Sequence, residues 1–227
     1  MNQPLIEPLY EDNHLLVVNK PAGLPTMGVP EGRPTLLSLA KEYVKERYQK
    51  PGNVYLGVVS RLDAPVTGVV LLARTSKAAA RLTEQFRNRD VEKTYWAVVE
   101  GAIEPAVGNL VDWLGHDDRH RRMHIVGPTL AGAREARLAY RRLPVVQEGC
   151  WLEVRLETGR KHQIRLQLSH AGHPIVGDRK YGSRVLFSPG IALHARRLAI
   201  SHPTTGVRIE FEAPLPKTWR RFNIPER

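Results

Sequence analysis

The sequence is poor in the residues that cross-link or anchor proteins. Only one of its 227 residues is cysteine, Cys150. This excludes an intrachain disulfide and a cysteine-based zinc or iron–sulfur centre, and it fits a reducing compartment. Apolar runs such as 69–73 are far too short to cross a bilayer, and the first residues lack the pattern of a signal peptide. We therefore expect a cytoplasmic protein with no membrane association.

Acidic and aromatic residues are also scarce. The chain has 34 Lys+Arg against 23 Asp+Glu, a formal charge of +11, and 7% aromatic residues. Excess cations attract polyanions, most often nucleic acid, although a basic surface can also serve solubility alone. Clustered arginines favour phosphate contacts, whereas so few aromatics argue against a surface of stacked bases. The clusters comprise Arg119, Arg121, Arg122, Arg134, Arg137, Arg141, Arg142, Arg196, Arg197, Arg220 and Arg221.

No internal repeat, low-complexity stretch or long linker interrupts the chain, so one domain over 1–227 is predicted. Apolar runs and helical patterns do not alternate as βαβ units, which indicates an α+β fold with a large mixed, mostly antiparallel sheet. The stretch 108–130, within a predicted insertion of about 108–135, is expected to be a loop or ribbon standing off the core. Strands are predicted at 14–19, 54–59, 68–74, 94–99, 151–158 and 207–212, and helices from Thr35, from an N-cap at Ser76, and over 162–171.

A first candidate site lies between two apolar runs, in the segment 57–74. It contains Arg61 and Asp63 beside Pro65 and Gly68. A carboxylate held in a tight turn at a strand end can act as a nucleophile or base. Aspartate is also a common turn residue, so a purely structural role, including pairing with Arg61, stays open.

A second candidate site lies in the segment 156–182. Arg160, Lys161 and Arg165 cluster near a predicted helix start, which favours an anion, although a solvated basic face is the alternative. Arg165 interrupts the apolar residues Ile164 and Leu166, so we expect it to be partly buried. A buried guanidinium needs a carboxylate partner, and Asp63 is a candidate.

Together with three other segments, these two resemble the RluA-type family of RNA pseudouridine synthases. The family motifs occur in order along nearly the whole chain. Ser60 and Val66 depart from the usual His and Thr of the second motif, and Gln167 replaces a frequent His. The matching segments are Glu11-DNHLLVVNKPA-Gly23, Ser60-RLDAPVT-Gly68, Lys93-TYWAVVE-Gly101, Thr158-GRKHQI-Arg165 with Gly177-DRKY-Gly182, and Leu193-HARRLAISHPTT-Gly206.

The resemblance implies a fold, a reaction and a partner. The fold would be a pseudouridine-synthase-type catalytic domain, with the sheet flanked by helices and loops around a central cleft. The reaction would convert uridine in rRNA or tRNA to pseudouridine after the base is flipped from its stack, with no cofactor and no metal. The size and early start of the motifs imply a monomer without a separate N-terminal RNA-binding module of the S4 type.

The resemblance also assigns roles to residues. Asp63 would be the essential carboxylate, as nucleophile or as the base that takes a ribose proton, and Arg165 would pair with it. Tyr95 would lie against the uracil ring, although from the strand pattern alone it reads as a core aromatic. Arg61 would fill the space left by the flipped base or contact the RNA backbone. The implied substrate-binding residues are Arg61, Thr67, Arg160, Lys161, Gln163 and Ile164.

Three competing interpretations remain. The departures at Ser60 and Val66 are compatible with a catalytically impaired RNA-binding or ribosome-assembly factor, but the intact Asp63, Tyr95 and Arg165 argue against it. A nuclease or glycosidase would need a second acid or a metal-activated water, for which the sequence offers no good candidate. Histidines at four-residue intervals superficially resemble a metal site, but intervening arginines disfavour a cation. These histidines are His116, His120 and His124.

Overall fold

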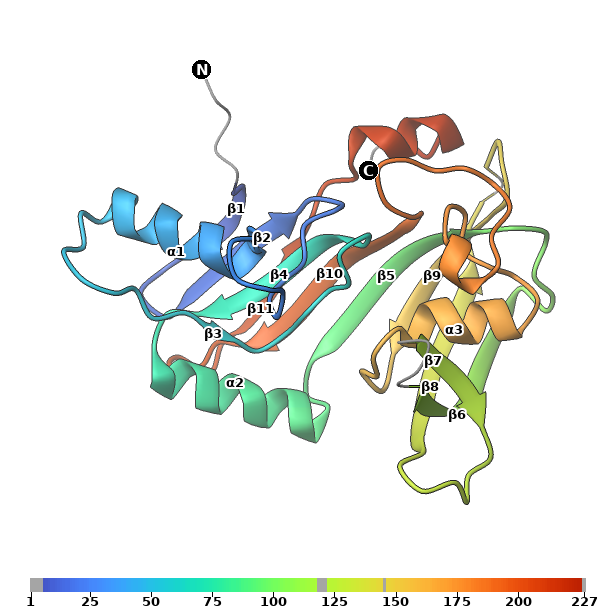
Figure 1. The fold of residues 1–227 in the computed structure, drawn as a ribbon, viewed down its shortest axis with the longest axis horizontal. Helices are drawn as coiled ribbons and strands as arrows, with labels where there is room; N and C mark the ends of the chain where they lie inside the picture. Colours follow the sequence, from blue (N-terminus) through green and yellow to red (C-terminus); the bar gives the residue numbers. More distant parts are fainter. Residues whose placement is uncertain (1–5, 118–121, 145, 226–227) are drawn as a thin grey trace. The chain divides into compact units, whose positions relative to one another are not determined.

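The computed structural model describes residues 6–117, 122–144 and 146–225 (Figure 1). The chain divides into two compact units. Unit 1 consists of Met1–Glu92 and Ala195–Leu215, and unit 2 consists of Lys93–His194 and Pro216–Arg227. One catalytic domain over 1–227 stays a prediction, and each unit is described separately below.

The sheet of unit 1 is built around two strands that are apolar along their whole length. Strands β2 (Leu15–Lys20) and β4 (Thr67–Ala73) pair in antiparallel register from Leu15↔Ala73 to Lys20↔Gly68. Both faces of this pair are covered, which explains the continuous hydrophobic runs. The predicted strand at 54–59 shrinks to two residues. The remaining strands are β1 (Pro8–Glu11), β3 (Gly57–Val58), β10 (Leu193–Ser201) and β11 (Arg208–Glu212).

Helix α1 (Leu36–Arg47) covers one face of this sheet. Its apolar positions Leu36, Ala40 and Val44 recur at helical spacing and are buried against residues of β2 and β4. Thr35 is the N-cap: its hydroxyl accepts from Ser38 N at 3.0 Å, and Ser38 Oγ accepts from Thr35 N at 3.0 Å. The predicted helix start is therefore confirmed by a capping box.

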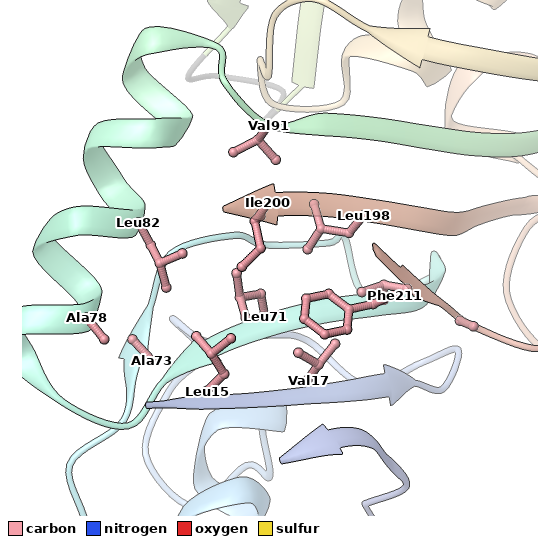
Figure 2. Close-up of a cluster of buried hydrophobic side chains, with 12 residues drawn as sticks. Leu15, Val17, Leu71, Ala73, Ala78, Leu82, Val91, Leu198, Ile200 and Phe211 are labelled. Atoms are coloured by element: carbon pink, nitrogen blue, oxygen red, sulfur yellow. The ribbon is translucent and has the colours of Figure 1, made fainter. Parts of the chain in front are cut away.

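Helix α2 (Ser76–Asn88) covers the opposite face. Figure 2 shows Ala78 and Leu82 of this helix lying beside the apolar side chains of β2, β4, β10 and β11. The N-cap is Thr75, whose Oγ1 accepts from Ala78 N at 3.2 Å. The prediction of Ser76 as N-cap was wrong by one residue, because Thr75 and Ser76 are both good caps and only the backbone angles choose between them.

The sheet of unit 2 is an antiparallel series of five strands. Strand β5 (Glu92–Val99) pairs with β9 (Cys150–Leu156), β9 with β8 (Arg134–Arg142), β8 with β6 (Val107–Asp117), and β6 with β7 (Arg122–Val126). Most of the described residues of the predicted ribbon at 108–135 thus belong to strands of this sheet. The ribbon also does not stand off from apolar packing, because a small core joins it to the helix that follows β9. That core contains Leu114, Met123, Ala136, Leu166 and Tyr181.

The helix that follows β9 is α3 (Gln163–His170). It begins after His162, which has a left-handed backbone with φ 55°. Two short 3₁₀ helices complete unit 2, η1 (Arg179–Tyr181) and η2 (Lys217–Phe222).

The fold class is α+β with mostly antiparallel strand pairs, as predicted. The strand predicted at 207–212 starts one residue too early, because β11 begins at Arg208 and Val207 is 61% exposed. Among the described residues, no helix has both the length and the apolar character that crossing a membrane requires.

Candidate active site

Asp63 lies in the loop that joins β3 to β4 in unit 1. Its side chain is partly exposed, and its backbone carbonyl accepts a hydrogen bond from Val66 N at 3.0 Å. This bond closes a tight turn through Ala64 and Pro65, and the buried Val66 side chain anchors the end of the turn. The carboxylate therefore projects from a backbone whose direction is fixed.

A second segment of unit 1, residues 21–26, is hydrogen-bonded to both sides of Asp63. The buried Thr26 hydroxyl donates to Leu62 O at 2.8 Å and accepts from Leu62 N at 3.1 Å. Gly23 N donates to Ala64 O at 2.8 Å. The residue after Asp63 is thus held by Gly23 of the first sequence motif, and the residue before it by Thr26, which lies just beyond that motif.

Lys20, at the end of β2, completes this framework. Its side chain is fully buried, and Nζ donates to the carbonyls of Pro21, Leu24 and Ala64 at 2.8, 2.7 and 3.1 Å. These three bonds use all the donors of an ammonium group. Burial lowers the pKa of Lys20 to about 7, while the negative charge of Asp63 opposes that shift. The sequence reasoning missed Lys20, although a lysine that ends an otherwise apolar strand was a usable signal.

Gly68 fixes the far end of the Asp63 loop. Its φ is +113°, and a Cβ built on it would lie 2.2 Å from the carbonyl oxygen of Ala195 on β10. No other residue fits both this backbone angle and this close approach. The close packing of β4 against β10 within unit 1 therefore explains why the second motif has glycine at this position.

The four remaining motif positions around Asp63 have different environments. Ser60 Oγ accepts from Leu71 N at 3.3 Å, so this departure from the family pattern ties the loop to β4. Arg61 is exposed, whereas Thr67 is buried at the first residue of β4. Val66, the other departure from the family pattern, is buried as well.

Tyr95 and Arg165 belong to unit 2. Tyr95 lies on β5 opposite Val154 and is partly exposed, whereas the next residue, Trp96, is buried. Arg165 in α3 is 5% exposed, as its position between two apolar residues predicts. Its Nε and Nη2 donate to the two carboxylate oxygens of Asp178 at 2.7 and 2.9 Å.

Asp178 therefore supplies a carboxylate partner that sequence reasoning did not assign to Arg165. This bidentate pair is almost completely buried, since the side chains are 6% and 2% exposed. Asp178 belongs to the motif segment 177–182, so its presence there was the available signal. The pairing of Arg165 with Asp63 stays a prediction.

Gln163 holds the turn that precedes α3. Its Oε1 accepts from Thr158 Oγ1 at 2.8 Å and from Arg160 N at 3.0 Å, and its Nε2 donates to Arg137 O at 3.0 Å. Gln163 and Ile164 are both buried, so their predicted contact with substrate stays a prediction.

A comparison with known sequences decides the family. The family model described as RNA pseudouridylate synthase matches residues 14–170. The chain belongs to this family. It is similar to the ribosomal large subunit pseudouridine synthase D of Pseudomonas aeruginosa, with 37% identity over 93% of this chain and 69% of the relative. It is also similar to the dual-specificity RNA pseudouridine synthase RluA of Haemophilus influenzae, with 35% identity over 93% of this chain and 94% of the relative.

Solved structures agree with this assignment. The structure of human RNA pseudouridylate synthase domain containing 4 matches with a TM-score of 0.78 and 26% identity, covering 95% of this chain and 92% of that chain. The related human domain-containing 1 protein shares the fold, with a TM-score of 0.76 at 24% identity. The protein is thus an isomerase that acts on RNA and converts uridine to pseudouridine.

Several arginines that suggested RNA binding are paired within the synthase. Arg137 lies 2.7 Å from Glu135, Arg141 lies 3.2 Å from Glu153, and Arg142 pairs with Glu104. Arg196 and Arg197 share Glu212, and Arg221 pairs with Glu148. Arg119 and Arg121 lie outside the described residues. Clustering in the sequence therefore overstated the positive charge that these segments offer to a ligand.

Arg160 and Lys161 have different partners. Arg160 Nε donates to the backbone carbonyl of Glu135 at 2.9 Å, and Lys161 Nζ lies 3.4 Å from His116 Nε2. Both side chains are exposed at the start of α3. Neither of these contacts involves a carboxylate. In them, the positive charges of Arg160 and Lys161 are therefore not offset by an acidic side chain, as those of the paired arginines are.

Two of the three histidines considered as metal ligands, His116 and His124, lie on strands. His116 is on β6 and His124 is on β7, in the register Gly115↔His124 and His116↔Met123. His120 lies outside the described residues. Within the part of the chain that the structure describes, no group of three His, Cys, Asp or Glu side chains is placed to hold a metal ion.

Proposed function

We propose that the synthase isomerises uridine in rRNA or tRNA, with Asp63 as the essential carboxylate. The observation that supports this role is the anchoring of the Asp63 turn by Lys20 of the first motif and by Thr26, which follows that motif. Groups that do chemistry must be held in a narrow range of directions. A surface aspartate with only a turn-forming role would not need a buried lysine and a buried threonine on either side.

The reaction rearranges bonds within one nucleotide. The N1–C1′ bond of uridine breaks, the uracil turns, and C5 forms the new bond to C1′. C5 then loses its hydrogen, and N1 gains one, so the product has the mass of the substrate. Asp63 starts this sequence either by attacking as a nucleophile or by removing a ribose proton.

The other motif residues support the detached base and its ribose. Tyr95 provides a flat face against uracil, and its hydroxyl can transfer the proton at C5. Arg165 aligns the Asp63 carboxylate through a charge-assisted hydrogen bond. The target base leaves its stack before it reaches Asp63, and Arg61 fills the vacated space or contacts the backbone. Thr67, Gln163 and Ile164 complete the contacts to the nucleotide.

The substrate class follows from chemistry and from relatives. Exposed Arg160 and Lys161 at the start of α3 bind RNA phosphate, since two cationic side chains lie next to each other there. One relative is named for the large ribosomal subunit and another for dual specificity. We therefore favour rRNA, with tRNA as the second substrate, and a monomer that acts in the cytoplasm.

Tritium release tests this proposal. Unmodified rRNA and tRNA carrying tritium at uracil C5 are incubated separately with the wild-type protein, with Asp63→Asn and with Asp90→Asn. Asp90 is an exposed aspartate of the same unit, so its variant matches the chemical change. We expect release of tritium to water by the wild type and Asp90→Asn, and none by Asp63→Asn. RNA affinity of Asp63→Asn, measured by filter binding, should stay within about twofold of the wild type.

Two results contradict parts of the proposal. Normal turnover by Asp63→Asn shows that Asp63 is not the essential carboxylate. Release from neither RNA pool by the wild type contradicts the proposed substrate class. Release from rRNA alone selects rRNA as the substrate.

A further inference from the structure

Tyr181 connects three elements of unit 2, although the proposed mechanism gives it no role. It is the last residue of η1, it is 2% exposed, and it belongs to the small core that contains Met123 and Leu166. A phenol is expensive to bury unless its hydroxyl is satisfied. We therefore expect both the ring and the hydroxyl of Tyr181 to have partners within unit 2.

The hydroxyl of Tyr181 joins α3 to the β6–β7 hairpin. It lies 2.7 Å from His162 Nδ1 at the N-cap of α3, and it accepts a hydrogen bond from Met123 N of β7 at 3.3 Å. Its ring also lies under the guanidinium of Arg122 in β7, with 5.6 Å from Cζ to the ring centroid. Tyr181 thus contacts both the start of α3 and strand β7 of the hairpin.

The ring of Tyr181 also contacts Arg165. The Arg165 Cζ atom lies 5.0 Å from the ring centroid, within the range of a cation–π interaction. Asp178, at the other end of η1, grips the edge of the same guanidinium. The two ends of one short 3₁₀ helix therefore fix both the edge and the face of Arg165.

We propose that Tyr181 is a positioning residue that couples the β6–β7 hairpin to the guanidinium of Arg165. This inference rests on the proposed role of Arg165 beside Asp63. Met123 and Arg122 contact the Tyr181 hydroxyl and ring, and the ring contacts Arg165, so a change in the position of β7 would reach Arg165 through Tyr181. His162 has a strained left-handed backbone conformation. Its hydrogen bond to Tyr181 helps to stabilise that conformation and fixes the position of the Tyr181 hydroxyl.

The principal test is Tyr181→Phe, which removes the hydroxyl and keeps the ring. We expect kcat to fall about 10-fold with KM for RNA within about twofold of the wild type, because a small misalignment of a reacting group affects turnover more than binding. Tyr140→Phe is the matched control. Tyr140 is also buried in unit 2, at 5% exposed, and its hydroxyl donates to Pro105 O at 3.3 Å, away from Arg165. We expect its kcat to stay unchanged even where its Tm falls as much as that of Tyr181→Phe.

A second variant tests the same bond from its other partner. His162→Asn removes the imidazole but suits a left-handed backbone, since asparagine tolerates that conformation. If the two residues act through one hydrogen bond, Tyr181→Phe combined with His162→Asn lowers kcat no further than either change alone. Amide exchange of Met123 should also become faster in Tyr181→Phe, because its acceptor is lost.

The outcomes separate this inference from the proposed function. Unchanged kcat in Tyr181→Phe and in His162→Asn, or a fall matched by Tyr140→Phe, overturns the coupling while Arg165→Ala and Asp63→Asn still abolish turnover. Full turnover in Arg165→Ala instead contradicts the proposed role of Arg165, and the coupling with it. A selective fall in kcat with non-additive double-variant behaviour supports the coupling.

Discussion

The ammonium of Lys20 donates a hydrogen bond to the carbonyl of Ala64, which directly follows Asp63, across 44 residues of sequence. This bond joins the end of β2 to the loop that carries the proposed essential carboxylate. Burying a lysine charge is costly, and the lowered pKa of Lys20 records that cost. When protonated, Lys20 donates to three carbonyls at once, which offsets part of that cost.

Lys20 should make the stability of the protein depend on pH in a defined direction. Folded Lys20 releases its proton near pH 7, whereas the unfolded side chain keeps it until about 10.5. The unfolded state therefore binds more protons between these values, so stability rises with pH there, by at most about 1.4 kcal/mol per pH unit. The measurement is urea unfolding of the wild type and Lys20→Met from pH 6.5 to 9.5. The wild type should gain stability relative to the variant as pH rises, and a constant difference contradicts this burial cost.

Gly68 should tolerate no side chain. Gly68→Ala places a Cβ against the Ala195 backbone and forces a positive φ on alanine, so we expect a loss of at least about 3 kcal/mol in unfolding free energy. Gly28→Ala is the control, because Gly28 also has a positive φ, +77°, but no atom lies within 4 Å of the point that its Cβ would occupy. That variant should lose only about 1 kcal/mol. Equal losses in both variants show that backbone strain, not the close approach of β4 and β10, decides the need for glycine.

The Arg165–Asp178 pair should behave as a buried ion pair. Asp178→Asn leaves the guanidinium without its bidentate carboxylate, and we expect a loss of about 3–5 kcal/mol in unfolding free energy. Glu92→Gln, which breaks the exposed pair with Arg208, should cost no more than about 0.5 kcal/mol. Guanidinium chloride is unsuitable for this comparison because it screens charge, so urea unfolding is used. A small loss in Asp178→Asn means that other groups hold Arg165.

The basic residues should differ in their contribution to RNA binding. Arg160→Ala with Lys161→Ala should reduce the slope of log K against log salt by about 2, because each phosphate contact contributes about one counterion. Arg141→Ala with Arg142→Ala should change the slope less, since Arg142 pairs with Glu104 and Arg141 shares Glu153 with Arg155. Filter binding between 50 and 300 mM salt measures both slopes, at about these concentrations. The reverse order would place the phosphate path along β8.

The sequence by itself determined where several strands and helices form, because apolar runs, helical periodicity and capping residues act over short stretches of chain. Apolar runs gave β2 and β4, and the Thr35 cap with Leu36, Ala40 and Val44 gave α1, since periodicity and capping act over a few residues. The ordered motifs gave the family and drew attention to Asp63, Tyr95 and Arg165. The predicted element boundaries were wrong by one residue at Val207 and at Ser76, because moving the end of a strand or helix by one residue changes the local free energy little.

Only the tertiary structure decided which groups meet across long sequence separations. It showed that Lys20 donates a hydrogen bond to the Asp63 loop and that Asp178 forms an ion pair with Arg165. It also showed that several of the clustered arginines form ion pairs with glutamates. Residue type alone could not reveal these contacts. A buried charge chooses its partner by geometry and desolvation, and both are set by how distant segments pack.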